Sequence, residues 1–203
     1  LGAQHSQAFE SWYAHIPGLK VVMPATPADA KGLLKSAIRD NDPVVFIEGE
    51  MLYNLKGEVP EGEHLVPIGV ADVKRAGNDV TIVCHSKTVA PALNAAKALS
   101  EEGIDAEVLD LRTLRPLDVD AIVATVTKTR RAVVVDEGWK TCSLAAEIMA
   151  TIVERAFYEL DAPLARVCSA EGPIPYATHR EDHARQEAGG QVVEGEDIGR
   201  ARS

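Results

Sequence analysis

The sequence predicts an α/β fold with a mainly parallel sheet. Aromatic residues make up only 4% of the 203 residues, while Val, Leu, Ile and Ala are abundant, as is common where strands are buried on both faces. Along residues 80–168, short apolar runs alternate with stretches of helical periodicity. This alternation favours parallel strands joined by helical crossovers that cover both faces of the sheet.

Residues 1–52 predict two short strands on either side of one helix. The strands are expected at 21–23 and 44–47, the second of them buried. Thr26 is followed by a proline and, three residues on, by Asp29, which is typical of a helix N-terminus. The helix should end before Pro43, because a residue that precedes proline avoids the α region. Its apolar positions share one predicted buried face: Ala30, Leu33, Leu34, Ala37 and Ile38.

Residues 53–67 are polar and contain two glycines and two prolines, which predicts a linker between two domains. Beyond it we expect four strands, at 80–84, 107–111, 132–136 and 166–168. Three helices lie between them, and their predicted N-caps are Ser86, Asp118 and Ser143. Gly103 is expected to close the first helix, and Gly138 to form a turn after the third strand, with Trp139 packed against a neighbour.

Composition excludes several classes of protein. The net charge of −10 argues against nucleic-acid binding, and no apolar run is long enough for a membrane span or a signal peptide. Cys84, Cys142 and Cys168 lie too far apart for a disulfide framework or a metal-ligand motif. We expect them to be small buried hydrophobes in a reducing compartment. Residues 178–203 lack apolar periodicity, and this atypical tail is expected to be disordered.

Three positions could carry chemistry. His5 lies among polar neighbours and could transfer a proton or stabilise an oxyanion, although a lone histidine is more often structural. The helix end at 36–42 presents free carbonyls that could hold a monovalent cation, or be capped by water and Arg39. Arg112 and Arg115 follow a strand, where they could bind a phosphate or carboxylate or, more simply, form an interdomain or intersubunit ion pair. No phosphate-binding glycine loop is present.

Six strings occur in an order that resembles one family, the beta subunits of the thiamine-diphosphate-dependent pyruvate dehydrogenase component, which are transketolase-like. They are GAQHSQ, WYAHIPGLKVVMP, AKGLLKSAIRDNDPVVFIE, DLRTLRPLD, VVVDEGW and GPIPYA. The resemblance implies that 1–52 is the end of a pyrimidine-binding domain, 53–67 a linker, and 68–177 a transketolase C-terminal domain. The related branched-chain 2-oxoacid dehydrogenase beta subunit is an alternative.

The same resemblance implies roles for individual residues. His5 matches the family histidine that faces the cofactor and assists decarboxylation and acetyl transfer to lipoyl groups. Ala37, Ile38, Asp40 and Asp42 match residues whose backbone carbonyls hold a structural potassium ion. Family members often carry Asn at the last position, which matters little if the ligand is the main-chain oxygen.

The family further implies oxidative decarboxylation of pyruvate in an assembly of two alpha and two beta subunits. Thiamine diphosphate and magnesium would be held mainly by the alpha subunit, and the acetyl group would pass to a lipoyl domain of the dihydrolipoyl acetyltransferase core. The acid that pairs with the aminopyrimidine lies upstream of Leu1 in the family, so we expect this chain to be a piece that is inactive alone. A non-catalytic assembly module is the alternative. We expect a bacterial cytoplasmic protein, or one of the mitochondrial matrix or plastid in a eukaryote.

Overall fold

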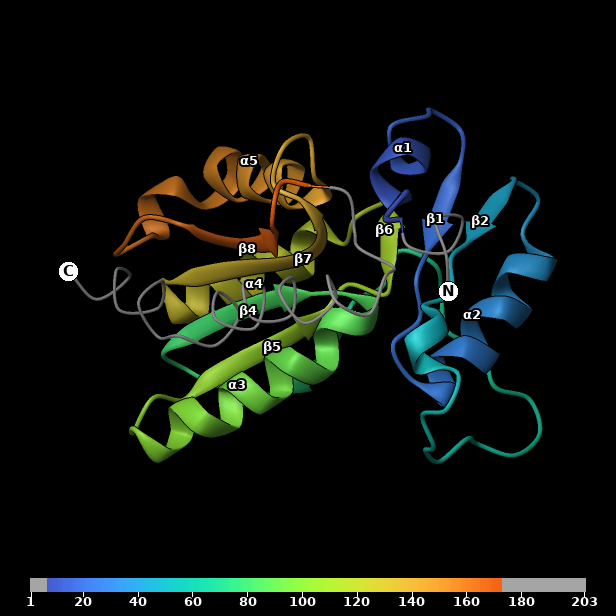
Figure 1. The fold of residues 1–203 in the computed structure, drawn as a ribbon, viewed down its shortest axis with the longest axis horizontal. Coiled ribbons are helices and arrows are strands. Elements are labelled where there is room, and N and C mark those ends of the chain that lie inside the picture. The colour runs from blue at the N-terminus through green and yellow to red at the C-terminus, as the bar shows by residue number, and fades with distance from the viewer. Residues whose placement is uncertain (1–6, 173–203) are drawn as a thin grey trace.

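The computed structural model describes residues 7–172 (Figure 1). In this part of the chain, one sheet has the strand order β2-β1-β6 and the other β3-β5-β4-β7-β8. Strands pair in parallel except for β1 with β6 and β3 with β5. The predicted α/β class with a mainly parallel sheet is confirmed. His5 and the tail at 178–203 lie outside the described residues.

The first region, the described residues up to 52, matches the predicted strand–helix–strand order and has an additional short helix before the first strand. Its elements are α1 (Glu10–Ala14), β1 (Lys20–Val22), α2 (Pro27–Arg39), β2 (Val44–Phe46) and the 3₁₀ turn η2 (Glu50–Leu52). The predicted cap of α2 is confirmed, because Thr26 Oγ1 accepts a hydrogen bond from the Asp29 N–H at 3.1 Å. The prediction that the second strand is buried is wrong, because β2 lies at the edge of its sheet and is only half-buried.

Helix α2 buries a different face from the predicted one. Leu33 is fully buried, but Leu34 and Ile38 are 44% and 75% exposed. The buried side centres on Gly32, where an added Cβ would lie 2.5 Å from a methyl carbon of Val66. The prediction of a single buried apolar face is therefore wrong for Leu34 and Ile38, because the segment that contains Val66 packs on the side of Gly32.

The second region, the described residues from 68 onward, contains all four predicted strands and all three predicted helices. Its elements are β3 (Asp72–Arg75), β4 (Val80–Cys84), η3 (Ser86–Thr88), α3 (Val89–Glu101), β5 (Ala106–Asp110), β6 (Thr113–Arg115), α4 (Val119–Thr129), β7 (Ala132–Trp139), α5 (Leu144–Ala156), η4 (Phe157–Glu159) and β8 (Ala165–Ser169). The two strands that the sequence did not predict, β3 and β6, are the antiparallel ones.

Capping and turn predictions had mixed outcomes. Asp118 caps α4 as predicted and accepts a hydrogen bond from the Ala121 N–H at 3.0 Å. The prediction for Ser86 is wrong: its φ is +51°, and it lies inside a 3₁₀ turn that precedes α3. Ser143 holds the N-cap position of α5, but its side chain makes no capping hydrogen bond. The turn predicted at Gly138 is also wrong, because β7 continues through it to Trp139.

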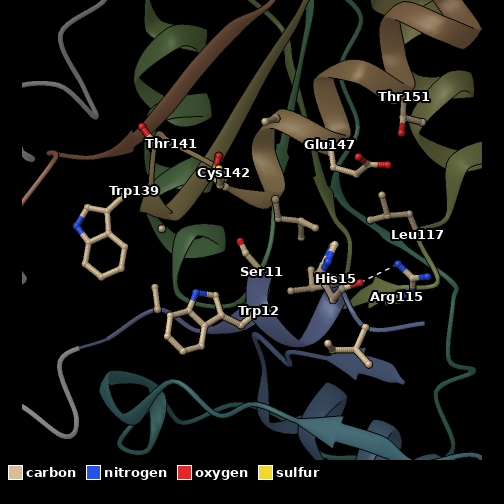
Figure 2. A pocket seen from close by; sticks show the side chains of 18 of the residues that line it. Ser11, Trp12, His15, Arg115, Leu117, Trp139, Thr141, Cys142, Glu147 and Thr151 are labelled. Carbon is tan, nitrogen blue, oxygen red and sulfur yellow. Dashed lines mark hydrogen bonds between the residues drawn. The ribbon is translucent and has the colours of Figure 1, made fainter. Parts of the chain in front are cut away.

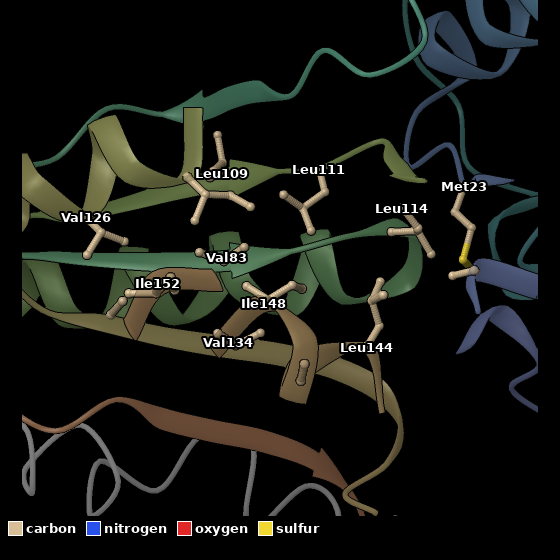
Figure 3. Packing of buried hydrophobic residues seen from close by; sticks show 14 of the residues in the cluster. Met23, Val83, Leu109, Leu111, Leu114, Val126, Val134, Leu144, Ile148 and Ile152 are labelled. Atoms are coloured by element: carbon tan, nitrogen blue, oxygen red, sulfur yellow. The ribbon is translucent and has the colours of Figure 1, made fainter. Parts of the chain in front are cut away.

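The large sheet carries a separate apolar layer on each face. Val83, Leu109 and Val134 point toward α4 and α5, where they meet Ile122, Val126, Ile148 and Ile152 (Figure 3). Their neighbours in sequence, Ile82, Val108 and Val133, point to the opposite face and pack with Ala92, Ala96 and Leu99 of α3. This alternation follows from the two-residue period of a strand.

The two regions share strand pairing and an apolar core. Strand β6 leaves the second region and pairs antiparallel with β1 of the first, with Val21 opposite Arg115. Met23 and Leu114 lie in the same core cluster as Leu111 and Val83, so the layer under α4 and α5 extends into the first region (Figure 3). The regions are therefore packed as one body around a common core.

The predicted burial of the three cysteines is confirmed for two of them and wrong for the third. Cys84 and Cys168 are buried as expected, whereas Cys142 is exposed, so the prediction of burial is wrong for that residue. Cys142 follows the end of β7 in a left-handed conformation with φ +57°.

Among the described helices, none has the length and apolar character that crossing a bilayer requires.

Candidate functional site

The structure describes the chain from Gln7 onward, so the predicted catalytic His5 lies just outside it. The described chain continues through Ala8 into α1. This helix lies between the two regions, next to β1 and β6 (Figure 1). The described chain therefore begins beside α1, at Gln7, two positions after His5 in the sequence.

The four predicted potassium ligands lie together where α2 ends. Ala37 and Ile38 occupy the last turn, Asp40 is the C-cap, and Asp42 precedes β2. Lys20 of β1 reaches this end: its Nζ lies 2.7 Å from Asp40 Oδ1 and 3.0 Å from Asp42 Oδ2. The hydrogen bond from Lys20 holds the pKa of Asp40 below its ordinary value. An ammonium group thus already offsets part of the negative charge at this helix end.

Arg112 joins the two regions, as the ion-pair interpretation predicted. Its Nη1 lies 3.2 Å from Asp29 Oδ1, and its guanidinium also donates to the Val70 carbonyl. Asp29 also accepts from Lys74 Nζ at 2.7 Å. Burial raises the pKa of Asp29, but the hydrogen bonds from Lys74, Thr26 and Arg112 bring it below its ordinary value. Arg115 Nη1 donates a hydrogen bond to the Ala14 carbonyl at the end of α1, at 2.8 Å.

A cavity of about 1140 Å³ lies between α1 and the start of α5 (Figure 2). Trp12 and His15 line it from α1, Arg115 and Leu117 from β6 and the loop after it. Trp139, Thr141, Cys142 and Glu147 line the opposite side (Figure 2). Trp12 is 71% exposed.

The cavity offers apolar walls with a few titratable groups, the usual composition of a ligand or partner site. Sequence reasoning noted Arg115 and Trp139 but missed His15, Cys142 and Glu147. The cavity forms between segments more than a hundred residues apart. The only local sign of it was the aromatic pair at Trp12 and Tyr13, which the resemblance already included. Ala8, close to His5 in sequence, also lines this cavity.

A second polar cluster lies buried between α1 and the large sheet. Glu10, His85 and Asp136 are at most 3% exposed. His85 Nε2 lies 3.7 Å from Asp136 Oδ1, and Asp136 accepts hydrogen bonds from the Gly138 and Ala145 N–H groups at 2.8 and 2.9 Å.

The three groups shift each other's pKa values. Burial raises the pKa of Glu10 above its ordinary value, although His85 opposes this. Burial lowers the pKa of His85, but Asp136 and Glu10 together raise it by more than burial lowers it. The pKa of His85 therefore lies above its ordinary value. Burial alone would raise the pKa of Asp136, yet His85 and the two backbone donors hold this pKa below its ordinary value. Within residues 7–172, no three His, Cys, Asp or Glu side chains are grouped in a way that could hold a metal ion.

Two family models match the chain in order. The transketolase pyrimidine-binding domain matches residues 1–56, and the transketolase C-terminal domain matches residues 69–188. In structure, the chain is similar to a split gene transketolase described as an inactive beta4 tetramer. The TM-score is 0.77 and the identity 25%, over 98% of this chain and 62% of that one.

Curated relatives are about 50% identical to this chain over the aligned residues. The mitochondrial pyruvate dehydrogenase E1 component subunit beta of Dictyostelium discoideum is 52% identical, over 91% of this chain and 53% of the relative. That of Mus musculus is 50% identical over the same shares. The beta subunit of acetoin:2,6-dichlorophenolindophenol oxidoreductase from Bacillus subtilis (strain 168) is 51% identical, over 89% and 53%. The chain spans about half the length of these relatives.

Proposed function

The chain belongs to the transketolase family, through the C-terminal domain that matches residues 69–188, and from this we propose that it is part of the beta subunit of a pyruvate dehydrogenase component. The proposed reaction is the oxidative decarboxylation of pyruvate with transfer of the acetyl group to a lipoyl protein. The observation that carries the proposal is the 52% identity to a pyruvate dehydrogenase beta subunit over 91% of the chain.

In this proposal, His5 transfers protons next to the cofactor. When bound, thiamine diphosphate supplies the electron sink that decarboxylation needs. We assign the cofactor and its magnesium mainly to the alpha subunit, and none of the described residues of this chain to holding either. The described part of the chain contributes position: it holds α1 against the C-terminal domain. The proposed partners are an alpha subunit, in a heterotetramer, and the dihydrolipoyl acetyltransferase core with its lipoyl domain.

The role of His5 can be tested in the intact beta subunit combined with its alpha subunit. His5→Ala should lower the acetylation of a lipoyl domain by about 10²-fold or more, the scale of a lost proton-transfer group. The circular dichroism spectrum and the unfolding midpoint should stay close to those of the unchanged protein. Unchanged turnover would contradict the catalytic role.

The substrate requires its own test, because the acetoin relative is almost as similar as the pyruvate relatives. The kcat/KM of the reconstituted enzyme should be compared for pyruvate, acetoin and 3-methyl-2-oxobutanoate. The highest value with pyruvate supports the proposal. Preference for acetoin or for the branched substrate would replace it with that activity. Tight binding of the alpha subunit without turnover of any of the three would indicate a non-catalytic assembly module.

We also propose that main-chain oxygens of Ala37, Ile38, Asp40 and Asp42 hold a potassium ion. The residues fit, because a helix end offers hard carbonyl oxygens with partial negative charge. Ion binding to the folded state alone raises the unfolding temperature. We expect KCl to raise this temperature more than choline chloride at equal ionic strength.

Two variants refine the potassium test. Asp42→Asn should keep the effect, since the proposed ligand is the main-chain oxygen. Lys20→Met should enlarge it, since the competing ammonium is gone. Equal stabilisation by both salts in all three proteins would rule out the site.

The functional division we propose has the pyrimidine-binding part at 1–52, the linker at 53–67 and the C-terminal domain at 68–177, supported by matches to 1–56 and 69–188. For location we propose the bacterial cytoplasm. The Bacillus subtilis relative supports this choice, and the mitochondrial relatives mark the matrix as the alternative.

A further inference from the structure

The order of strands in the large sheet creates a crevice between β4 and β7. From β4 the chain crosses to β5 on one side, whereas from β7 it crosses to β8 on the other. Open α/β sheets place their ligands outside the carboxyl ends of the strands at such a switch point. His85 follows the end of β4 and Asp136 lies toward the end of β7, so both belong to this crevice.

The chain itself fills the crevice with Glu10 of α1. A Cβ at Gly138 would lie 3.1 Å from Glu10 Oε1 and 3.2 Å from Asp136 Oδ1. Gly138 therefore lies between the two carboxylates, and its lack of a side chain lets them approach. Helix α1 comes from the first region, so this contact joins the two regions at the place where other α/β proteins bind ligands.

The contact is built from buried groups with incomplete hydrogen bonding. Among the described residues, Glu10 Oε1 has no hydrogen-bond partner, and His85 Nε2 approaches Asp136 Oδ1 only to 3.7 Å. A buried carboxylate without compensation is strongly destabilising, so such a group needs a nearby opposite charge or a proton. Among the described residues, a protonated His85 faces both Glu10 and Asp136 and can compensate their negative charge.

We infer that Glu10, His85 and Asp136 form a buried latch that holds α1, and with it the chain leading back to His5, on the carboxyl ends of β4 and β7. The latch is closed while His85 is protonated. Its second half, the placement of His5 for proton transfer, rests on the proposed function. The first half, the attachment of α1, does not.

The latch should respond to pH because its strength depends on the imidazolium. The folded state holds the pKa of His85 above the ordinary 6.5, so the contribution is complete below 6.5 and is lost as the pH rises through the folded value. The other charged groups around it are Lys87, which pairs with Glu137 at 2.5 Å, and Asp110 of β5. Burial lowers the pKa of Lys87 below its ordinary value, while the nearby carboxylate of Glu10 opposes this.

Hydrogen–deuterium exchange of the α1 amides in the full chain tests the latch without any activity. Rates should be measured between about pH 6 and about pH 9 and corrected for intrinsic exchange. We expect protection of α1 to fall about tenfold across this range, because the stabilisation that the imidazolium provides is lost as it deprotonates. In Glu10→Gln the buried negative charge is gone, so protection should no longer depend on pH. His85→Gln should lose protection at the lower pH as well.

Glu101→Gln, an exposed change on α3, is the matched control and should follow the unchanged protein. Protection of α1 that varies with pH equally in the unchanged chain and in Glu10→Gln would overturn the latch, as would pH-independent protection in the unchanged chain. In the reconstituted enzyme, Glu10→Gln should also move the basic limb of the pH–rate profile. Absence of turnover with any 2-oxoacid would overturn the proposed function and leave the exchange result standing.

Discussion

Asp110 is the residue whose surroundings most clearly oppose its charge. Its side chain is fully buried at the end of β5, and Oδ2 has no hydrogen-bond partner among the described residues. Burial raises the pKa of Asp110 to about 6, against the opposing charge of Lys74 at 3.6 Å. The folded state therefore binds this proton more tightly than the unfolded state, whose pKa is 3.8. Stability must fall as the pH rises between these two values.

Asp110→Asn should remove this dependence. The amide oxygen can still accept from the Arg112 N–H, which Oδ1 now accepts at 3.1 Å. Relative to the variant, the unchanged protein should lose about 3 kcal/mol of unfolding free energy between about pH 4 and about pH 7, from a shift of about two units. Urea unfolding of both proteins across this range measures the difference, and a constant difference would contradict the assigned pKa.

Local sequence rules identified residues whose role depends on their neighbours in sequence. Thr26 and Asp118 cap helices as predicted, because a cap is a contact within three residues. The prediction for Ser86 is wrong because a 3₁₀ turn with His85 at its N-cap position follows β4, and the N-cap position of α3 is held by Thr88. The cluster of Glu10, His85 and Asp136 could not be predicted, since its members meet only after three distant segments pack.

At the level of elements, β3 depends on a glycine that has no room for a side chain. A Cβ at Gly77, just after β3, would lie 2.3 Å from the carbonyl carbon of Ala106, the first residue of β5. Backbone cannot give way as a flexible side chain can. We therefore expect Gly77→Ala to separate β3 from β5 and to lower the unfolding free energy by about 2 kcal/mol or more, in the range of overpacked sites.

Gly172→Ala is the matched control, since nothing lies within 4 Å of its Cβ position. Its unfolding free energy should change by less than about 0.5 kcal/mol, as for most surface substitutions. Chemical denaturation measures both variants. Equal stabilities for the two would show that β3 can shift without loss.

Whether an element could be predicted depended on its length and its apolar pattern. The four parallel strands of the large sheet and the helices α2 to α5 are long or strongly apolar, and all were predicted, as were the three-residue strands β1 and β2, whose residues are all apolar except Lys20. Helix α1 has five residues, and β6 consists of Thr113, Leu114 and Arg115, too few for a period to appear. The apolar face of α2 was misassigned because periodicity shows that a face exists, not which neighbour covers it. Leu34 and Ile38 remain exposed.

For the whole molecule, the charged cluster around Asp29 connects the two regions. Lys74 and Arg112 of the second region both bind Asp29 at the start of α2. Removing one partner of a buried ion pair leaves the other charge poorly compensated. Because Lys74 stays in place, we expect Arg112→Ala to lower the unfolding free energy by about 2 kcal/mol, somewhat less than the full loss of a buried pair.

Arg130→Ala provides the comparison, because Arg130 pairs with Asp161 at the surface. Exposed pairs contribute little, so its unfolding midpoint should stay near that of the unchanged protein. Thermal unfolding followed by circular dichroism distinguishes the two variants. If Arg112→Ala were as stable as Arg130→Ala, the cluster would not hold the regions together.

Strand β6 gives this molecule an unusual tolerance to a broken backbone. A protease that cut the polar segment at 53–67 would leave β6 paired with β1, and Met23 and Leu114 would still share one core. The two fragments should therefore remain associated after cleavage. Produced separately, each would expose an unpaired strand edge and part of that core, which is a known route to aggregation. The two halves are thus suited to fragment complementation, in which neither piece is stable until it meets the other.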